Sequence, residues 1–197
     1  MLDFLQNVGY NIDTKFFGGA FMQKVKKILP FIAAGLALLA VIFLALPAGE
    51  WIFEDGEGIK FRGFALIFGG KLIWVEGTYT STEPYFAFSF VNFLSFLFVI
   101  AGMAFAIAGV MTKKKAFAFV AAGLFLVATI FFFCLIRGVA FDKTAEAFEG
   151  YTQAELNMER ALFIEACDLG VGAILPAICS LLAGVAVLVP AFIPDEK

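Results

Sequence analysis

Three acidic side chains, Glu54, Asp55 and Glu57, stand close together in the chain and could bind a metal ion. Calcium takes about six to eight oxygen ligands, and this spacing does not follow the EF-hand loop. We therefore expect a solvated acidic turn, with no metal and no cofactor. Together with Trp51 and Trp74, these carboxylates form a candidate interaction surface.

A second polar group, Ser89, Asn92 and Ser95, recurs every three residues, which places it along one ridge of a helix. Such side chains either form hydrogen bonds between helices or line a polar path. Three small groups near one helix end cannot wet a channel through a whole membrane. We therefore expect packing hydrogen bonds.

Cysteine is the third type of residue here that could do chemistry. In a four-span topology, Cys134 and Cys167 lie near the outer ends of helices. A disulfide between them is one candidate. The cysteines form no C-x-x-C pair, so a thiol redox motif or a zinc ribbon is not indicated. The chain has no His, which excludes His-ligated haem and the Ser-His and Cys-His nucleophilic sites. It also lacks phosphate-binding glycine motifs and a long basic run, so we expect neither nucleotide nor nucleic acid.

The composition of the chain indicates the class of fold that positions these acidic, polar and cysteine residues. The chain has 197 residues, of which 62% are hydrophobic and 16% charged, and its mean hydropathy is +0.94. A soluble domain is typically about 45–50% apolar and about 25% charged. A chain of this length has too little interior for so many apolar side chains, which predicts an integral membrane protein.

Uncharged runs predict an all-α membrane fold with a bundle of four transmembrane helices. Each run reaches the ~20 residues that a helix needs to cross the hydrocarbon core. The expected spans are 28–49, 84–112, 116–136 and 169–194, within a single domain 28–197 with outer loops 50–83 and 137–168. Residues 1–27 are expected to form a cytoplasmic amphipathic segment.

Lysines predict the orientation. Lys24, Lys26 and Lys27 precede the first span, and residues 113–115, all lysine, link the second span to the third. Because positive residues stay on the cytoplasmic side, we expect both termini in the cytoplasm of a plasma-membrane protein. An anionic-lipid site usually needs about four to eight basic residues, and we expect these lysines to anchor topology with weak lipid attraction as a side effect.

Small residues predict the packing faces of the helices. In the fourth span they recur at intervals of four, three and four, at Ala173, Ala177, Ser180 and Gly184. Such residues let helix backbones approach closely within a membrane.

The outer loops have secondary structure of their own. Residues 51–53 and 59–61 flank a glycine-containing turn, and 64–68 and 71–75 flank Gly69-Gly70, which predicts three or four antiparallel strands in a small extracellular sheet. Thr152 and Glu155 form a capping-box pattern that opens a helix over 153–167, which we expect to continue into the fourth span.

Trp51 and the run Gly70-Lys71-Leu72-Ile73-Trp74 resemble the W…G-L-W pattern of the claudin-like family of four-span membrane proteins. The resemblance implies a four-helix bundle with cytoplasmic ends, an outer sheet built by the first loop, and side-by-side association of these sheets. The two cysteines that the family carries after its second Trp are absent here.

These patterns favour a non-catalytic membrane protein that acts through lateral or extracellular contacts, as an adhesion protein, scaffold or accessory subunit. Its partner would be a second copy or another membrane protein. Two alternatives stay open. The first is a transporter or channel component lined by Ser89, Asn92 and Ser95. The second is a membrane enzyme or thiol oxidoreductase that uses the outer carboxylates or Cys134 with Cys167.

Overall fold

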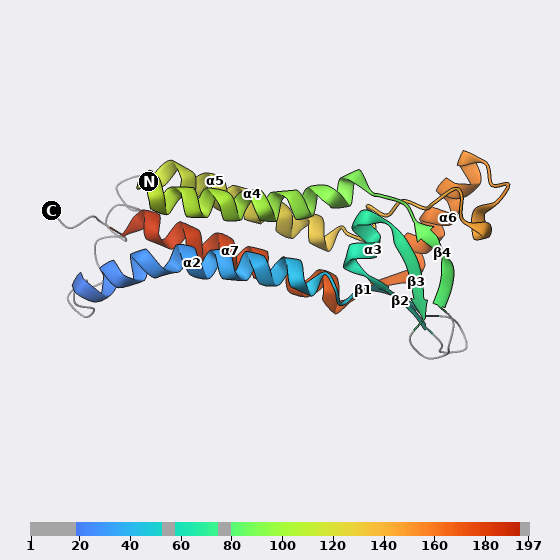
Figure 1. The fold of residues 1–197 in the computed structure, drawn as a ribbon, viewed down its shortest axis with the longest axis horizontal. Coiled ribbons are helices and arrows are strands. Elements are labelled where there is room, and N and C mark those ends of the chain that lie inside the picture. Colours follow the sequence, from blue (N-terminus) through green and yellow to red (C-terminus); the bar gives the residue numbers. More distant parts are fainter. Residues whose placement is uncertain (1–18, 53–57, 75–79, 194–197) are drawn as a thin grey trace, which may run out of the picture.

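A computed structural model describes residues 19–52, 58–74 and 80–193. Four long helices dominate it (Figure 1), and each contains an apolar stretch long enough to cross a membrane, as predicted. A helix suits such a segment because it satisfies its backbone hydrogen bonds internally. The four are α2 (Gly19–Phe43), α4 (Phe90–Thr112), α5 (Lys115–Phe133) and α7 (Val171–Phe192).

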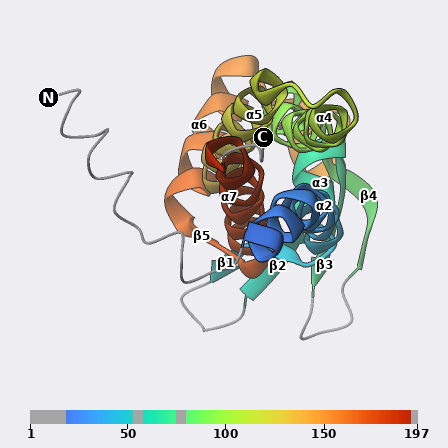
Figure 2. The same ribbon diagram turned by 90° about the vertical axis from the view of Figure 1, so that its left-hand side faces the viewer.

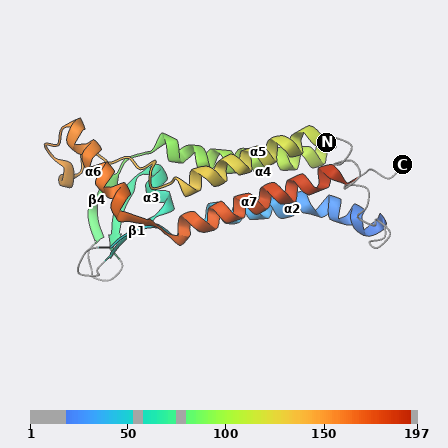
Figure 3. The ribbon, with the colours of Figure 1, turned by 180° about the vertical axis from the view of Figure 1, so that it is seen from behind.

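The long helices run side by side as a bundle (Figure 2). Helix α7 packs against α2 and α5, while α4 packs against α5 and α2. More than half of the apolar stretch of α7, 56%, is buried, against 22–28% in the other three, so α7 is the central helix. The turn at 113–115 marks the lysine end of the bundle, and a β-sheet covers the opposite, sheet end (Figures 1 and 3).

Small residues line the helix contacts, as their spacing predicts. The four positions singled out on α7 are all buried: Ala173, Ala177, Ser180 and Gly184. A Cβ atom added at Gly184 would lie 3.4 Å from Cβ of Phe125 on α5, so the two helices approach closely there. Small residues that allow such a close approach are typical of helix contacts in membrane proteins.

A single antiparallel sheet closes the sheet end. Its strand order is β4-β3-β2-β1-β5, so the last strand in the sequence lies beside the first. The strands are β1 (Pro47–Ile52), β2 (Gly58–Arg62), β3 (Gly70–Trp74), β4 (Thr80–Phe86) and β5 (Cys167–Leu169). A small antiparallel sheet was predicted, and β1 with β2 is the first expected hairpin.

The expected strand at 64–68 is wrong, because Gly63–Phe68 forms the short helix α3. A five-residue apolar run has the same hydrophobic pattern in a buried helix and in a buried strand. At Gly63 an added Cβ would lie 2.8 Å from a Leu44 methyl carbon, so the chain turns tightly against the end of α2. Helix α3 fills the space between the sheet and the bundle, where Leu66 and Ile67 are fully buried.

The second outer segment is helical, but its helix does not continue into the fourth span. Helix α6 (Gln153–Ala166) opens with the predicted capping box between Thr152 and Glu155. It ends because β5 follows it and pairs with β1, and Gly170 N–H then donates to Ala48 O at 2.9 Å. Sheet pairing therefore interrupts the expected continuous helix.

The first helix begins and ends earlier than the uncharged run 28–49. It starts at Gly19, so the three lysines before the run lie within α2 and no boundary falls at residue 27. It ends at Phe43, and Pro47 begins β1. Residues 1–18, and with them most of the expected amphipathic segment, lie outside the described residues.

The other three spans, unlike α2, are shorter than their uncharged runs. Helix α4 begins at Phe90 because residues 84–86 belong to β4, and α5 ends at Phe133 before a series of turns. Helix α7 covers Val171–Phe192 within the expected 169–194. Strand pairing and turns thus shorten the helices at the sheet end.

Candidate functional site

Asn92 joins three parts of the molecule at the junction between bundle and sheet. From α4, its Nδ2 donates to Leu66 O of α3 at 2.8 Å and to Leu135 O, just after α5, at 2.9 Å. The side chain is only 2% exposed, so both hydrogen bonds are sheltered from water. Asn92 therefore ties α3 and the end of α5 to α4.

The two serines of the ridge also bond to backbone groups. Ser89 caps α4 by accepting from Asn92 N–H at 3.1 Å, and its hydroxyl donates to Gly138 O. The Ser95 hydroxyl donates to Asn92 O at 2.6 Å. All three residues are buried.

Gly138 makes room for this arrangement. A Cβ atom added there would collide with Asn92 Oδ1. The ridge therefore makes packing hydrogen bonds, the first of the two functions considered for it: Ser89 and Asn92 reach carbonyls outside α4, while Ser95 bonds within the helix.

An aromatic cluster holds α6 against the sheet. Phe163 of α6 contacts Phe61 of β2, Phe86 of β4 and Phe141, with ring centroids 5.2–5.8 Å apart. Aromatic pairs at these distances stabilise beyond their area burial. The sequence patterns did not predict this cluster, because its four residues come from separate segments of the chain.

The two tryptophans of the expected interaction surface occupy one row of the sheet. Ile59 pairs with Trp51 on one side and with Trp74 on the other. Trp51 is half-buried and meets Phe163 edge to face at 6.0 Å, so it helps to hold α6 on the sheet.

The acidic turn Glu54, Asp55 and Glu57 lies outside the described residues. Within the described part of the chain, no group of three or more carboxylate or cysteine side chains is arranged to hold a metal ion. Glu50 of β1 instead forms an ion pair with Lys60 of β2, at 3.1 Å.

All three cysteines are free, so the Cys134–Cys167 disulfide that the sequence left as one candidate is not formed in this structure. Cys167 lies in β5, directly opposite Trp51, while Cys134 is exposed at the end of α5. Burial, followed by the nearby Asp168 carboxylate, raises the pKa of the Cys167 thiol to about 12. This residue is therefore protonated near neutral pH and a poor nucleophile.

Helix α6 carries two large apolar side chains on its open side. Met158 is 65% exposed and Leu162 47% exposed, one turn apart on the same face. The long apolar helices can face lipid, but α6 contains four charged or polar side chains among its exposed positions and is not a candidate span. Met158 and Leu162 are hereafter the α6 pair.

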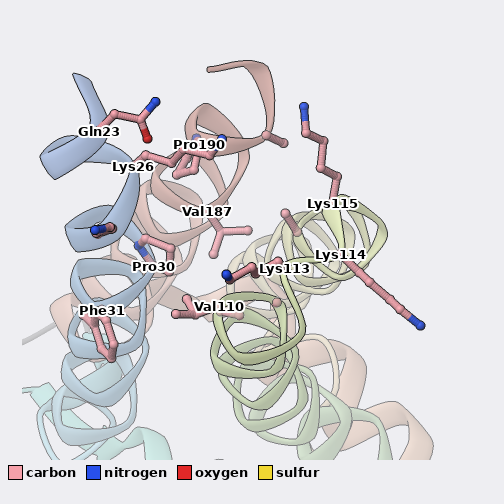
Figure 4. Close-up of a pocket in the computed structure, with 15 residues that line it drawn as sticks. Gln23, Lys26, Pro30, Phe31, Val110, Lys113, Lys114, Lys115, Val187 and Pro190 are labelled. Atoms are coloured by element: carbon pink, nitrogen blue, oxygen red, sulfur yellow. The ribbon is translucent and has the colours of Figure 1, made fainter. Parts of the chain in front are cut away.

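A pocket of about 660 Å³ opens at the lysine end of the bundle (Figure 4). Its walls are mostly apolar, and five lysines stand around it. The apolar residues are Pro30, Phe31, Ala106, Val110, Ala118, Val187, Pro190 and Ala191, and the lysines are Lys26, Lys27, Lys113, Lys114 and Lys115. The two lysine groups, predicted to share one surface, are thus brought together around a cavity that the sequence did not reveal.

The lysines differ in what they contact. Lys26 Nζ donates to Ile193 O at 3.1 Å, across from α2 to the end of α7. Lys113 extends from the end of α4 across the pocket toward α2, whereas Lys114 and Lys115 point away from it (Figure 4). Lys113 has a φ of 56°, and it is the one non-glycine residue with a positive φ in the described part of the chain.

The candidate sites are therefore the α6 pair at the sheet end and the lysine pocket at the other. Comparison with protein-family models, with curated proteins and with solved structures gives no match, so function has to be argued from this geometry.

Proposed function

We propose that the chain spans the plasma membrane four times, with the lysine end in the cytoplasm and the sheet outside. The lysines of α2 and of the turn 113–115 gather at one end, which supports a cytoplasmic position for that end. The sheet end carries ion-paired and acidic side chains such as Glu50 and Asp168.

We further propose that the protein works without catalysis, by binding a second copy of itself or another membrane protein. The α6 pair carries this proposal. Two neighbouring apolar side chains on a polar helix lose water-exposed apolar surface when a partner covers them. The claudin-like pattern at Trp51 and Trp74 agrees with side-by-side contacts between sheet ends.

The hydrogen bonds of Ser89, Asn92 and Ser95 support this function over a channel. Each side chain donates to a backbone carbonyl; the bonds of Ser89 and Asn92 reach other segments and hold the sheet end on the bundle, while that of Ser95 lies within α4. A water-lined path would need their donors free to bind water or ions.

Site-specific photo-crosslinking in native membranes tests the proposed function. A photoreactive amino acid at position 158 should give adducts of higher mass with a second copy or with a membrane partner. The same amino acid at Gln153, which is exposed at the polar start of α6, is the matched control and should give few adducts.

Introducing charge should then weaken the contact. Met158→Glu combined with Leu162→Glu is expected to remove the adducts while leaving the helical content unchanged, because both side chains are exposed. Equal adduct yields at 153 and 158, or a strictly monomeric particle without a partner after mild extraction, would contradict the proposal.

A further inference from the structure

The lysine pocket combines two chemistries that one class of ligand matches. Cationic side chains stand at its mouth and apolar side chains form its walls. If the bundle spans a membrane as proposed, this mouth lies at the level of the lipid headgroups. Basic pockets between helices at that level are suited to anionic headgroups.

Lys113 is the first specific argument for a ligand. Its left-handed backbone, with φ 56° and ψ 21°, is a conformation that favours glycine at the end of a helix. The chain instead places a lysine there, and its side chain extends across the pocket (Figure 4). A residue held in an unfavourable conformation at a cavity is a recurrent feature of binding sites.

The local charge is the second argument. Among the described residues that line the pocket there is no carboxylate, while Lys27 and Lys113 both line it. Helix α5 also begins here, and its N-cap residue Lys114 provides no side-chain hydrogen bond to the first turn. The free N–H groups of a helix start add to the attraction for an anion.

We propose that this pocket binds an anionic phospholipid, with its phosphate between Lys27 and Lys113 and an acyl chain against Phe31, Val110 and Val187. The volume of about 660 Å³ far exceeds what a bare phosphate needs and lies within the usual range of about 300–1,000 Å³ for organic ligands. The apolar walls contribute to binding only if the ligand carries a hydrocarbon chain, which favours lipid over free phosphate.

Native mass spectrometry of the full-length protein in mild detergent tests the proposal. Phosphatidylglycerol and phosphatidylcholine with identical acyl chains are the probes. The protein should retain phosphatidylglycerol preferentially, and Lys113→Gly should reduce its apparent affinity about fivefold, the change expected for one lysine near an anionic headgroup.

Lys24→Gln is the matched control. It removes the same charge at the same end of the bundle, from an exposed position of α2 that does not line the pocket. Its affinity should stay close to that of the unchanged protein. Because glycine suits the backbone of position 113, Lys113→Gly should leave the thermal unfolding midpoint unchanged or higher, so lost binding will not reflect unfolding.

A second variant tests the acyl-chain wall. Val110→Trp keeps every lysine and fills the apolar part of the pocket, so it should remove the preference for phosphatidylglycerol. If millimolar inorganic phosphate displaces the lipid and Val110→Trp has no effect, the site binds free phosphate and the proposal is wrong. Equal losses in Lys113→Gly and Lys24→Gln would mean diffuse surface attraction and would also overturn it.

This inference rests on the proposed membrane placement but not on the contacts of the α6 pair. Lipid retention is measured on the purified chain without a partner, and crosslinking at position 158 does not involve the pocket. Failure of one experiment therefore leaves the other result informative.

Discussion

At the scale of single residues, Asn92 has more structural consequence than any charged group in the described chain. It is a polar side chain in an apolar helix, and both hydrogens of its amide are used to satisfy backbone carbonyls of other segments. Buried polar networks that are fully bonded specify one arrangement of the parts they join. Asn92 thus fixes how the sheet end sits on the bundle.

Replacing Asn92 should therefore destabilise the protein. Asn92→Leu leaves the Leu66 and Leu135 carbonyls buried without donors, and we expect a loss of about 1–3 kcal/mol in the free energy of unfolding. The thermal unfolding midpoint in detergent should fall by several degrees. An unchanged midpoint would show that these hydrogen bonds do not hold the sheet end.

Ser180→Ala is the control for this prediction. The Ser180 hydroxyl is fully buried, and it has no hydrogen-bond partner among the described residues. Removing an unpaired buried hydroxyl costs no hydrogen bond, so the midpoint should stay the same or rise. A large fall here would mean that any polar substitution in the bundle is destabilising, whatever its bonding.

At the scale of elements, α7 depends on backbone contact with the chain that follows α2. A Cβ atom added at Gly172 would collide with Leu46 O, a backbone atom that cannot rotate away. Gly172→Ala should therefore lower the free energy of unfolding by about 1–3 kcal/mol. Chemical denaturation in mixed micelles would measure the change.

Gly35→Ala, in the middle of α2, is the matched substitution. Nothing lies within 4 Å of a Cβ atom at that position. Alanine is also the better helix former, by about 0.5–1 kcal/mol, so this variant should be as stable as the parent or more so. Equal destabilisation by both substitutions would contradict the close approach at Gly172.

The start of α6 should respond to acid. Hydrogen bonds from the backbone N–H and then the hydroxyl of Thr152, at 2.6 and 2.7 Å, lower the pKa of Glu155 below its ordinary 4.5. Because the folded pKa is depressed, the capping box stabilises α6 above that ordinary value and loses its effect as the pH falls through the lowered pKa. Amide-exchange protection of the first turn should therefore decrease in that acidic range.

Glu155→Gln supplies the comparison, since a neutral amide cannot titrate. Protection in this variant should vary less with pH than in the parent protein. If both lose protection equally, the acid effect arises elsewhere in the chain.

The sequence predicted whether a segment is a helix or a strand where its hydrophobic pattern is long. It did not predict the residues at which helices and strands begin and end. Four uncharged runs predicted the four apolar helices, but Lys24, Lys26 and Lys27 lie inside α2 because lysines near a helix end can extend to water. The run 64–68 was too short for its periodicity to separate helix from strand. The break after α6 depends on pairing between β5 and β1, which are distant in the sequence.

At the scale of the whole molecule, the two ends differ in charge and in construction. The sheet end is held by aromatic contacts around Phe163 and by the hydrogen bonds of Asn92. The lysine end is a set of helix ends around an open pocket. This asymmetry matches the two sides of a membrane, of which the cytoplasmic side carries the excess of basic residues.

The candidate sites were predictable to different degrees. The three-residue spacing of the Ser89 ridge indicated packing hydrogen bonds, but the carbonyl partners of Ser89 and Asn92 come from segments that no local pattern connects to α4. The lysine pocket forms between Lys27 and Lys113, which meet only when α2 and α4 pack together. Its apolar walls consist of residues from α2, α4, α5 and α7, which no local sequence pattern connects.

The most direct test of the account is the side of the membrane on which each end lies. Single cysteines at Lys114 and at Glu149, introduced into a chain lacking Cys134, Cys167 and Cys179, can be labelled on intact cells with an impermeant maleimide, since both positions are exposed. If the sheet end lies outside and the lysine end in the cytoplasm, position 149 reacts on intact cells and position 114 reacts only after the membrane is opened. Labelling of position 114 on intact cells, or a protein that stays dispersed in buffer without detergent, would contradict this placement.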